Sequence, residues 1–130
     1  MTLFQFPRAA LAALPALALM TQAALAESPA VTGQYDGQTY LMTAEKMTLY
    51  TFDKDAKDMS NCYGDCAVNW PPLLADAGAE LPRGYGLIDR TDGTKQVAYK
   101  GQPLYRWFKD AKPGDMTGDG VKGVWHTARP

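Results

Sequence analysis

The chain has 130 residues, 46% of them hydrophobic, and its 13 basic and 14 acidic residues leave a formal net charge of −1. The basic residues are dispersed and form no cationic run that could follow a phosphate backbone, which argues against a nucleic-acid partner. Beyond residue 26 no stretch stays apolar for the roughly 20 residues that a membrane-spanning helix needs, so no stable membrane span is expected there.

The N-terminal segment has the features of a cleaved signal peptide. Arg8 precedes the apolar stretch AALAALPALALM at residues 9–20, and residues 24–26 read ALA, the small-x-small pattern that a signal peptidase recognises. The apolar stretch is short for a permanent anchor, and no cysteine lies near the cut to carry a lipid. We therefore expect cleavage after Ala26 and export to the periplasm, where residues 27–130 fold as one domain.

Nearly the same nine residues occur twice in the chain. LYTFDKDAK occupies residues 49–57, and LYRWFKDAK follows 55 residues later at 104–112. In each copy a tryptophan, Trp70 or Trp125, follows the tyrosine by 20 residues. Internal similarity at a fixed spacing predicts a supersecondary unit that has been duplicated.

The local signals around the two copies are those of strands. The short β-branched and aromatic runs are TYLMT, MTLYTF, GLIDR, KQVAYK and PLYRWF, and the polar turns AEK, TDGT and KGQ separate them. No segment after residue 26 sustains a helical apolar period over 12 positions, and ADAGAELPRGYG at 75–86 is the expected connection between the halves. The sequence predicts a mainly β, compact single domain of two pseudo-repeated antiparallel β units with short loops, at about 33–74 and 87–128.

YTFDKD and YRWFKD both fit the pattern Tyr-x-aromatic-x-x-Asp, and the chain resembles the bacterial secreted-repeat lipoprotein family that carries this pattern in tandem. The segments CYGDCAVNWPPLL and KPGDMTGDGVKGVWH are also similar to that family. The resemblance implies an envelope protein of unassigned function. Many family members have a lipidated cysteine after the signal peptide, and because this chain lacks one, membrane tethering is not carried over.

The six residues of this pattern, called the signature residues below, are Tyr50, Phe52, Asp55, Tyr105, Trp107 and Asp110. Side chains alternate between the faces of a strand, so the tyrosine and the second aromatic of each copy share a face, which we expect to be the core. Each aspartate comes just past the strand, where a carboxylate can cap a turn. The alternative is a pair of aromatic-plus-carboxylate pockets for a ligand.

Cys62 and Cys66 are the only cysteines, and in an exported protein an even count predicts a disulfide. The loop that it closes is small, so its expected contribution to stability is about 2 kcal/mol. The spacing is neither the C-x-x-C of redox pairs nor the C-x-x-C-H of haem attachment. A structural bond is the first interpretation, and a redox-active or thiol–metal role is the alternative.

His126 is the only histidine, and we expect an ordinary residue at a strand end. It could instead join both cysteines and Met59 or Met116 in a copper site, because soft sulfur ligands favour Cu(I). An oxidising compartment would, however, oxidise the thiols first.

The segment DMTGDG resembles part of a calcium loop. Asp115, Thr117 and Asp119 occupy its first, third and fifth positions, with Gly120 at the sixth. The twelfth position is His126 instead of the glutamate that binds calcium through both oxygens. Such Asp-Gly richness is also typical of turns, which is the interpretation we favour.

The chain has no Ser-His-Asp order, no phosphate-binding glycine loop and no ligand set with zinc spacing, so no enzymatic activity is expected. The first interpretation is a monomeric, non-enzymatic periplasmic module that binds a small ligand or another envelope protein and needs no cofactor. The alternative is a protein that handles copper or undergoes thiol chemistry, and calcium binding is a third hypothesis.

Overall fold

The computed structural model describes residues 28–130, so the predicted signal peptide and its cleavage after Ala26 lie outside the described residues. The elements along the chain are β1 (Ala30–Tyr35), β2 (Gln38–Thr43), β3 (Tyr50–Phe52), α1 (Asp65–Asn69), β4 (Tyr85–Asp89), β5 (Lys95–Tyr99), β6 (Gln102–Pro103), the 3-10 helix η1 (Val121–Gly123) and β7 (Trp125–Thr127). The fold is mainly β, as the sequence predicted. No helix within residues 28–130 has the length and apolar character to cross a membrane.

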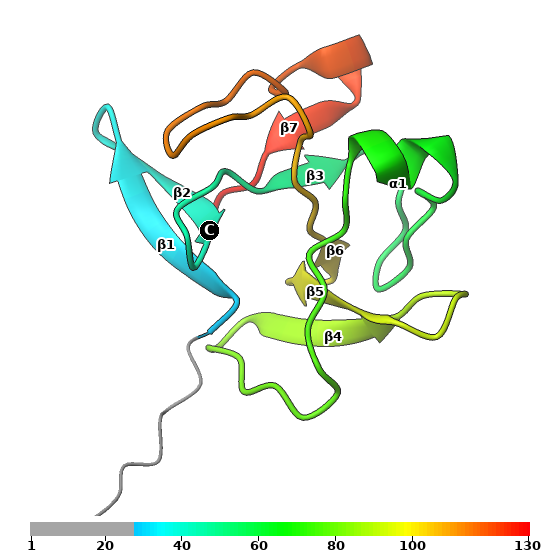
Figure 1. Ribbon diagram of the computed structural model, residues 1–130. Coiled ribbons are helices and arrows are strands. Elements are labelled where there is room, and N and C mark those ends of the chain that lie inside the picture. The colour runs from blue at the N-terminus through cyan, green and yellow to red at the C-terminus, as the bar shows by residue number, and fades with distance from the viewer. Residues whose placement is uncertain (1–27) are drawn as a thin grey trace, which may run out of the picture.

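The strands form three small antiparallel sheets, β1–β2, β3–β7 and β4–β5–β6. Figure 1 shows the sheets arranged around a common interior, with β1–β2 at the left, β3–β7 at the top and β4–β5–β6 below. The β1–β2 hairpin turns at Asp36 and Gly37, whose φ angles of 52° and 77° are both in the left-handed region. Two such residues in a row match the primed turn that fits the twist of a two-residue hairpin.

Two predicted strands are much shorter than expected. Only Tyr50–Phe52 of MTLYTF forms a strand, and only Pro103 of PLYRWF lies in one. Both segments change partner within a few residues: Leu49 N–H donates to Leu41, whereas Tyr50 N–H donates to Tyr105. Because each segment crosses the middle of the domain instead of following one neighbour, neither builds a long ladder.

The two copies are related by an approximate twofold axis that passes between Tyr50 and Tyr105. Each of these residues donates its backbone N–H to the carbonyl of the other, at 2.8 and 3.0 Å. Asp53 N–H donates to the Val124 carbonyl at 2.8 Å. The equivalent residues with the copies exchanged, Phe108 and Asn69, form the same backbone bond at 3.0 Å. The strand β3 of the first copy therefore pairs with β7 of the second, and the copies interlock.

The interior consists of an aliphatic cluster and an aromatic cluster. The aliphatic cluster contains Ala30, Leu41, Leu49, Val97, Leu104 and Ala128. The aromatic cluster contains Tyr50, Cys62, Trp70, Tyr105 and Trp125. Each cluster contains residues from both copies, so the two copies share one interior and neither has a separate hydrophobic core.

Candidate functional site

The signature tyrosines and aspartates bond across the two copies. Tyr50 donates its hydroxyl to Asp110 Oδ2 at 2.6 Å, and Tyr105 donates to Asp55 Oδ2 at the same 2.6 Å. Both tyrosines are fully buried. Each copy thus supplies the acceptor for the tyrosine of the other, and a hydrogen bond between a buried hydroxyl and a carboxylate is among the stronger ones in proteins.

The second oxygen of each aspartate holds the loop that follows its own strand. Asp110 Oδ1 accepts the backbone N–H and the hydroxyl of Thr117, at 2.9 and 2.7 Å. Asp55 Oδ1 accepts the backbone N–H of Asn61 at 2.7 Å. The aspartates therefore fix local loops, as the sequence suggested, and also join the two copies.

Burial shifts the titration of these groups. It raises the pKa of Tyr50 and of Tyr105 far above the usual value of 10.0, and the bond that each donates to its aspartate raises it further. Burial also raises the pKa of Asp55, an effect that the bonds from Tyr105 and Asn61 partly offset. The tyrosines accordingly keep their protons across the physiological range.

Four aromatic rings form one continuous stack, called the aromatic stack below, in the order Phe52, Trp125, Trp70 and Trp107. The ring centroids are 4.1, 3.7 and 4.0 Å apart along this order, and the first two pairs are nearly parallel, at 9° and 2°, whereas Trp107 is tilted by 32° against Trp70. The outer rings are the second aromatics of the two signatures, and the inner rings are the tryptophans found 20 residues after each tyrosine. The stack is thus symmetric about the same axis as the tyrosines.

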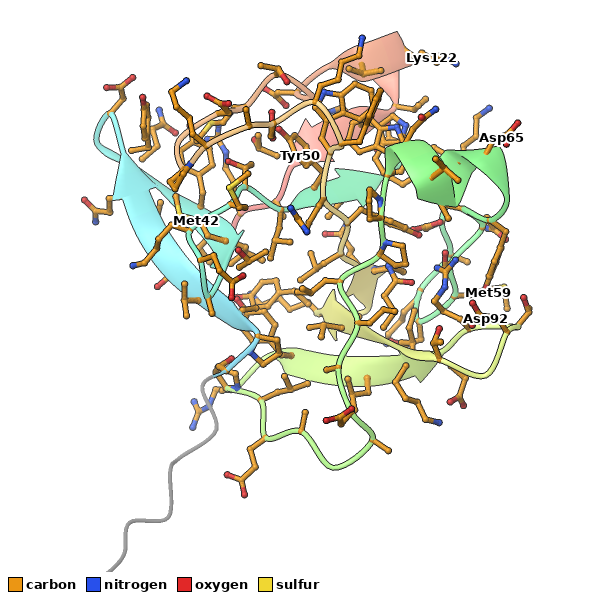
Figure 2. All side chains as sticks on the ribbon, viewed as in Figure 1. Met42, Tyr50, Met59, Asp65, Asp92 and Lys122 are labelled. Atoms are coloured by element: carbon orange, nitrogen blue, oxygen red, sulfur yellow. A yellow bond between two sulfur atoms is a disulfide. The ribbon has the colours of Figure 1, made fainter. Side chains whose placement is uncertain are left out.

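A groove of about 350 Å³, called the inter-repeat groove below, runs along this stack. It is lined by all four rings of the stack, by Cys66, Val121 and Val124, and by the polar residues Lys54, Asp65, Asn69 and Lys122. Volumes of roughly 300–1,000 Å³ with mostly apolar walls and a few polar groups are typical of small-molecule sites. Lys122 and Asp65 are labelled in Figure 2, at the outer side of η1 and of α1.

Cys62 and Cys66 form a disulfide with an S–S distance of 2.07 Å. Cys62 is fully buried, and Cys66 lies in the wall of the groove at the start of α1. This helix has five residues and no side-chain cap at its N-terminus, and the disulfide joins it covalently to the buried segment before it. The bond holds one wall of the groove in place.

Arg90 fastens the same segment to β5. The guanidinium donates to Ser60 Oγ, to Gln96 Oε1 and to the Cys62 carbonyl at distances of 3.0, 2.8 and 2.8 Å. It also lies 4.2 Å from the centre of the Tyr63 ring. Arg90 is only 5% exposed, and a buried charge satisfied by this many oxygens has a structural role.

The residues of the calcium and copper hypotheses have separate partners in the structure. Asp115 accepts backbone N–H groups of Ala111 and Lys112, and Asp119 Oδ1 accepts the N–H of Thr127 at 3.0 Å. His126 Nε2 lies 2.9 Å from Asp53 Oδ2. Thr117 bonds Asp110 as described above, and both cysteine sulfurs are in the disulfide. Across residues 28–130, no three His, Cys, Asp or Glu side chains gather in a way that could hold a metal ion.

Gly118 gives a test of how tightly the stack is packed. A Cβ atom added there would lie 2.8 Å from Trp107 Cγ and 2.8 Å from Trp70 Cη2, so both indoles would have to move. We expect Gly118→Ala to lower the free energy of unfolding by about 1–3 kcal/mol, as overpacking of a core usually does. Urea denaturation followed by tryptophan fluorescence measures the change.

Gly78→Ala is the matched control, because a Cβ atom at Gly78 would meet nothing within 4 Å. It should leave stability unchanged or raise it slightly by reducing the freedom of the unfolded chain. Equal stability of the two variants would show that the stack can open to admit a methyl group.

The sequence identified the signature residues but not their partners. It left out Asp65 and Asn69 of α1, Val121 and Lys122 of η1, and Arg90. One signal was present: Trp70 and Trp125 lie at the same distance from their tyrosines, which could have paired them as equivalent core residues. No local pattern marks Arg90, because two of its three acceptors, on Ser60 and Cys62, lie about 30 residues earlier in the chain.

The comparisons with known proteins agree with this duplicated architecture. No curated protein and no solved structure matches the chain. The family described as a secreted repeat of unknown function matches residues 32–74 and residues 86–129, one match for each copy. With two interlocked repeats that cover most of the described residues, the chain belongs to this family of secreted repeats.

Proposed function

We propose that this protein is a non-enzymatic, monomeric periplasmic module that holds a small ligand in the inter-repeat groove. The observation that carries the proposal is the groove itself, about 350 Å³ beside four stacked aromatic rings, at the junction of the two repeats. Its apolar walls offer burial to a ligand, and its polar rim offers orientation. The secreted character of the family agrees with a site in the envelope.

The absence of catalysis in this proposal follows from how the signature carboxylates are used. Asp55 and Asp110 accept hydrogen bonds from tyrosines whose pKa values are raised far above neutral pH, so these tyrosines keep their protons. A general acid or base needs a proton that it can exchange near the working pH. The tyrosine–aspartate pairs instead keep the two repeats in register, so that the groove between them keeps its shape.

A neutral aromatic probe tests the proposal. In NMR titrations of the folded protein, 2-naphthol should shift the indole N–H signals of Trp70, Trp107 and Trp125 with saturating behaviour. Val124→Phe, which adds bulk to a groove wall, should abolish the saturation. Val68→Phe is the matched control, because Val68 is 68% exposed on α1 but does not line the groove.

Saturation that survives Val124→Phe, or shifts that spread evenly over the surface, would contradict the proposal. Sedimentation velocity at several protein concentrations examines the expected monomer in the same samples. A dimer that forms in the native protein and is lost in Val124→Phe would assign the groove to a second copy of the chain.

A further inference from the structure

We infer that the ligand of the inter-repeat groove is a small organic anion with a flat apolar body, such as an arene carboxylate. This inference rests on the proposed function and names the class of ligand. Three features of the groove support it: the covered faces of the inner rings, the charges at the rim, and the place of these charges in the two repeats.

The first feature is that the inner rings of the stack line the groove without offering an open face, since Trp70 and Trp125 are only 4% and 3% exposed. Trp125 is covered on one face by Phe52 and on the other by Trp70, at centroid distances of 4.1 and 3.7 Å. Trp70 is in turn covered by Trp125 and by Trp107. A sugar ring binds by lying on an open aromatic face, and these inner faces are closed. Aromatic edges carry partial positive charge, which favours an electron-rich or anionic group.

The second feature is an excess of positive charge at the rim. Lys54 and Lys122 both line the groove, whereas Asp65 is its only acidic residue. Asp53 N–H bonds the Val124 carbonyl at 2.8 Å, so the chain segments that continue to the two lysines run side by side. The two lysines therefore belong to adjacent backbone segments that both border the groove, and one bound carboxylate can attract both ammonium groups.

The third feature is that these charges depart from the symmetry of the repeats. The residue equivalent to Lys122 in the first copy is Ala67, within the regular helix α1. Lys122 has a φ of 52°, in the left-handed region that non-glycine residues occupy at a cost. Lys109, which is equivalent to Lys54, is absent from the lining and lies 5.7 Å from the Phe108 ring. The four rings of the stack are thus duplicated, whereas the two lysines have no lysine equivalent in the lining.

The experiment compares three probes of the same shape: 2-naphthoate, 2-naphthamide and 2-naphthylmethylamine, titrated by NMR at low ionic strength. Naphthoate should bind about tenfold more tightly than the amide, and the amine should bind most weakly. Raising the salt concentration from about 20 to 300 mM should remove most of the difference between naphthoate and the amide, because exposed charges are screened at that strength.

The variants Lys54→Gln and Lys122→Gln should each weaken naphthoate binding about two- to fivefold and leave naphthamide binding unchanged, as expected for partly exposed ion pairs. Lys109→Gln is the matched control, because Lys109 is the equivalent of Lys54 in the second copy. It should change the affinity for neither naphthoate nor naphthamide. All three positions are exposed, so these variants should fold.

The outcomes separate the two proposals. Equal affinity for naphthoate and naphthamide, with both lost in Val124→Phe, would overturn the anion inference and leave the groove as a binding site. Loss of naphthoate affinity in Lys109→Gln of the same size as in Lys54→Gln would also overturn it, because nonspecific charge would then explain the preference. If none of the probes saturates, the proposed function fails together with the inference.

Discussion

Asp110→Ala is expected to lower the free energy of unfolding by about 2–4 kcal/mol, a large share of the 5–15 kcal/mol typical of a domain. Asp110 is 8% exposed and accepts three hydrogen bonds, one from Tyr50 and two from Thr117. Without the carboxylate, buried donors lose their acceptor, and leaving such groups unpaired costs more than the net value of a hydrogen bond. Urea denaturation followed by tryptophan fluorescence measures the loss.

Asp55→Ala is the matched comparison, because Asp55 is the equivalent of Asp110 in the first copy. Asp55 is less buried, and Tyr105 keeps a second partner at 2.6 Å in the Ser60 hydroxyl. We therefore expect Asp55→Ala to cost about half as much as Asp110→Ala.

A double-mutant cycle isolates the bond that crosses between repeats. Tyr50→Phe should cost about 1.5–3 kcal/mol in the native background, the range for hydrogen bonds to charged groups, and much less when Asp110 is already alanine. A coupling energy below about 0.5 kcal/mol would mean that the bond between Tyr50 and Asp110 does not hold the copies together, and that Asp110 acts only on its own loop.

The cycle depends on a contact that the sequence indicated only in part. The alternation in YTF and YRW predicted that the first and third side chains share a face, and both tyrosines are indeed buried. The position of the aspartates predicted turn contacts, which Asn61 and Thr117 provide. Local sequence carries no information on which tyrosine an aspartate reaches, because both copies have the tyrosine and the aspartate at the same spacing.

The same limit explains the differences in strand length. Residue patterns predict how long a segment favours extended backbone, and both MTLYTF and PLYRWF favour it throughout. Strand length in the structure depends on how long one neighbour stays alongside, and near the axis the neighbours change after a few residues. The groove also depends on docking, since α1 belongs to the first copy and η1 to the second, and residues of both line it.

High pH should destabilise the protein steeply through the same tyrosines. In the folded state, burial and the bonds to aspartate raise the pKa of Tyr50 and Tyr105 above 10.0, whereas in the unfolded chain both ionise near that value. Their contribution to stability is therefore complete below about pH 10 and declines above it, because only the unfolded state releases the protons. Each tyrosine should lower the free energy of unfolding by about 1.4 kcal/mol per pH unit, so the pair gives about 2.7.

Urea denaturation at a series of pH values between about 8 and 11 measures this slope, and absorbance at about 295 nm counts the tyrosinates that form when the chain unfolds. Tyr85, whose pKa burial also raises, should add a smaller part to the slope. In Tyr50→Phe the dependence of the free energy of unfolding on pH should be less steep by the contribution of one tyrosine, about 1.4 kcal/mol per pH unit. The variant should also be less stable than the native protein at pH 8. An unchanged slope would mean that Tyr50 ionises within the folded protein, which its short bond to a carboxylate and its full burial both oppose.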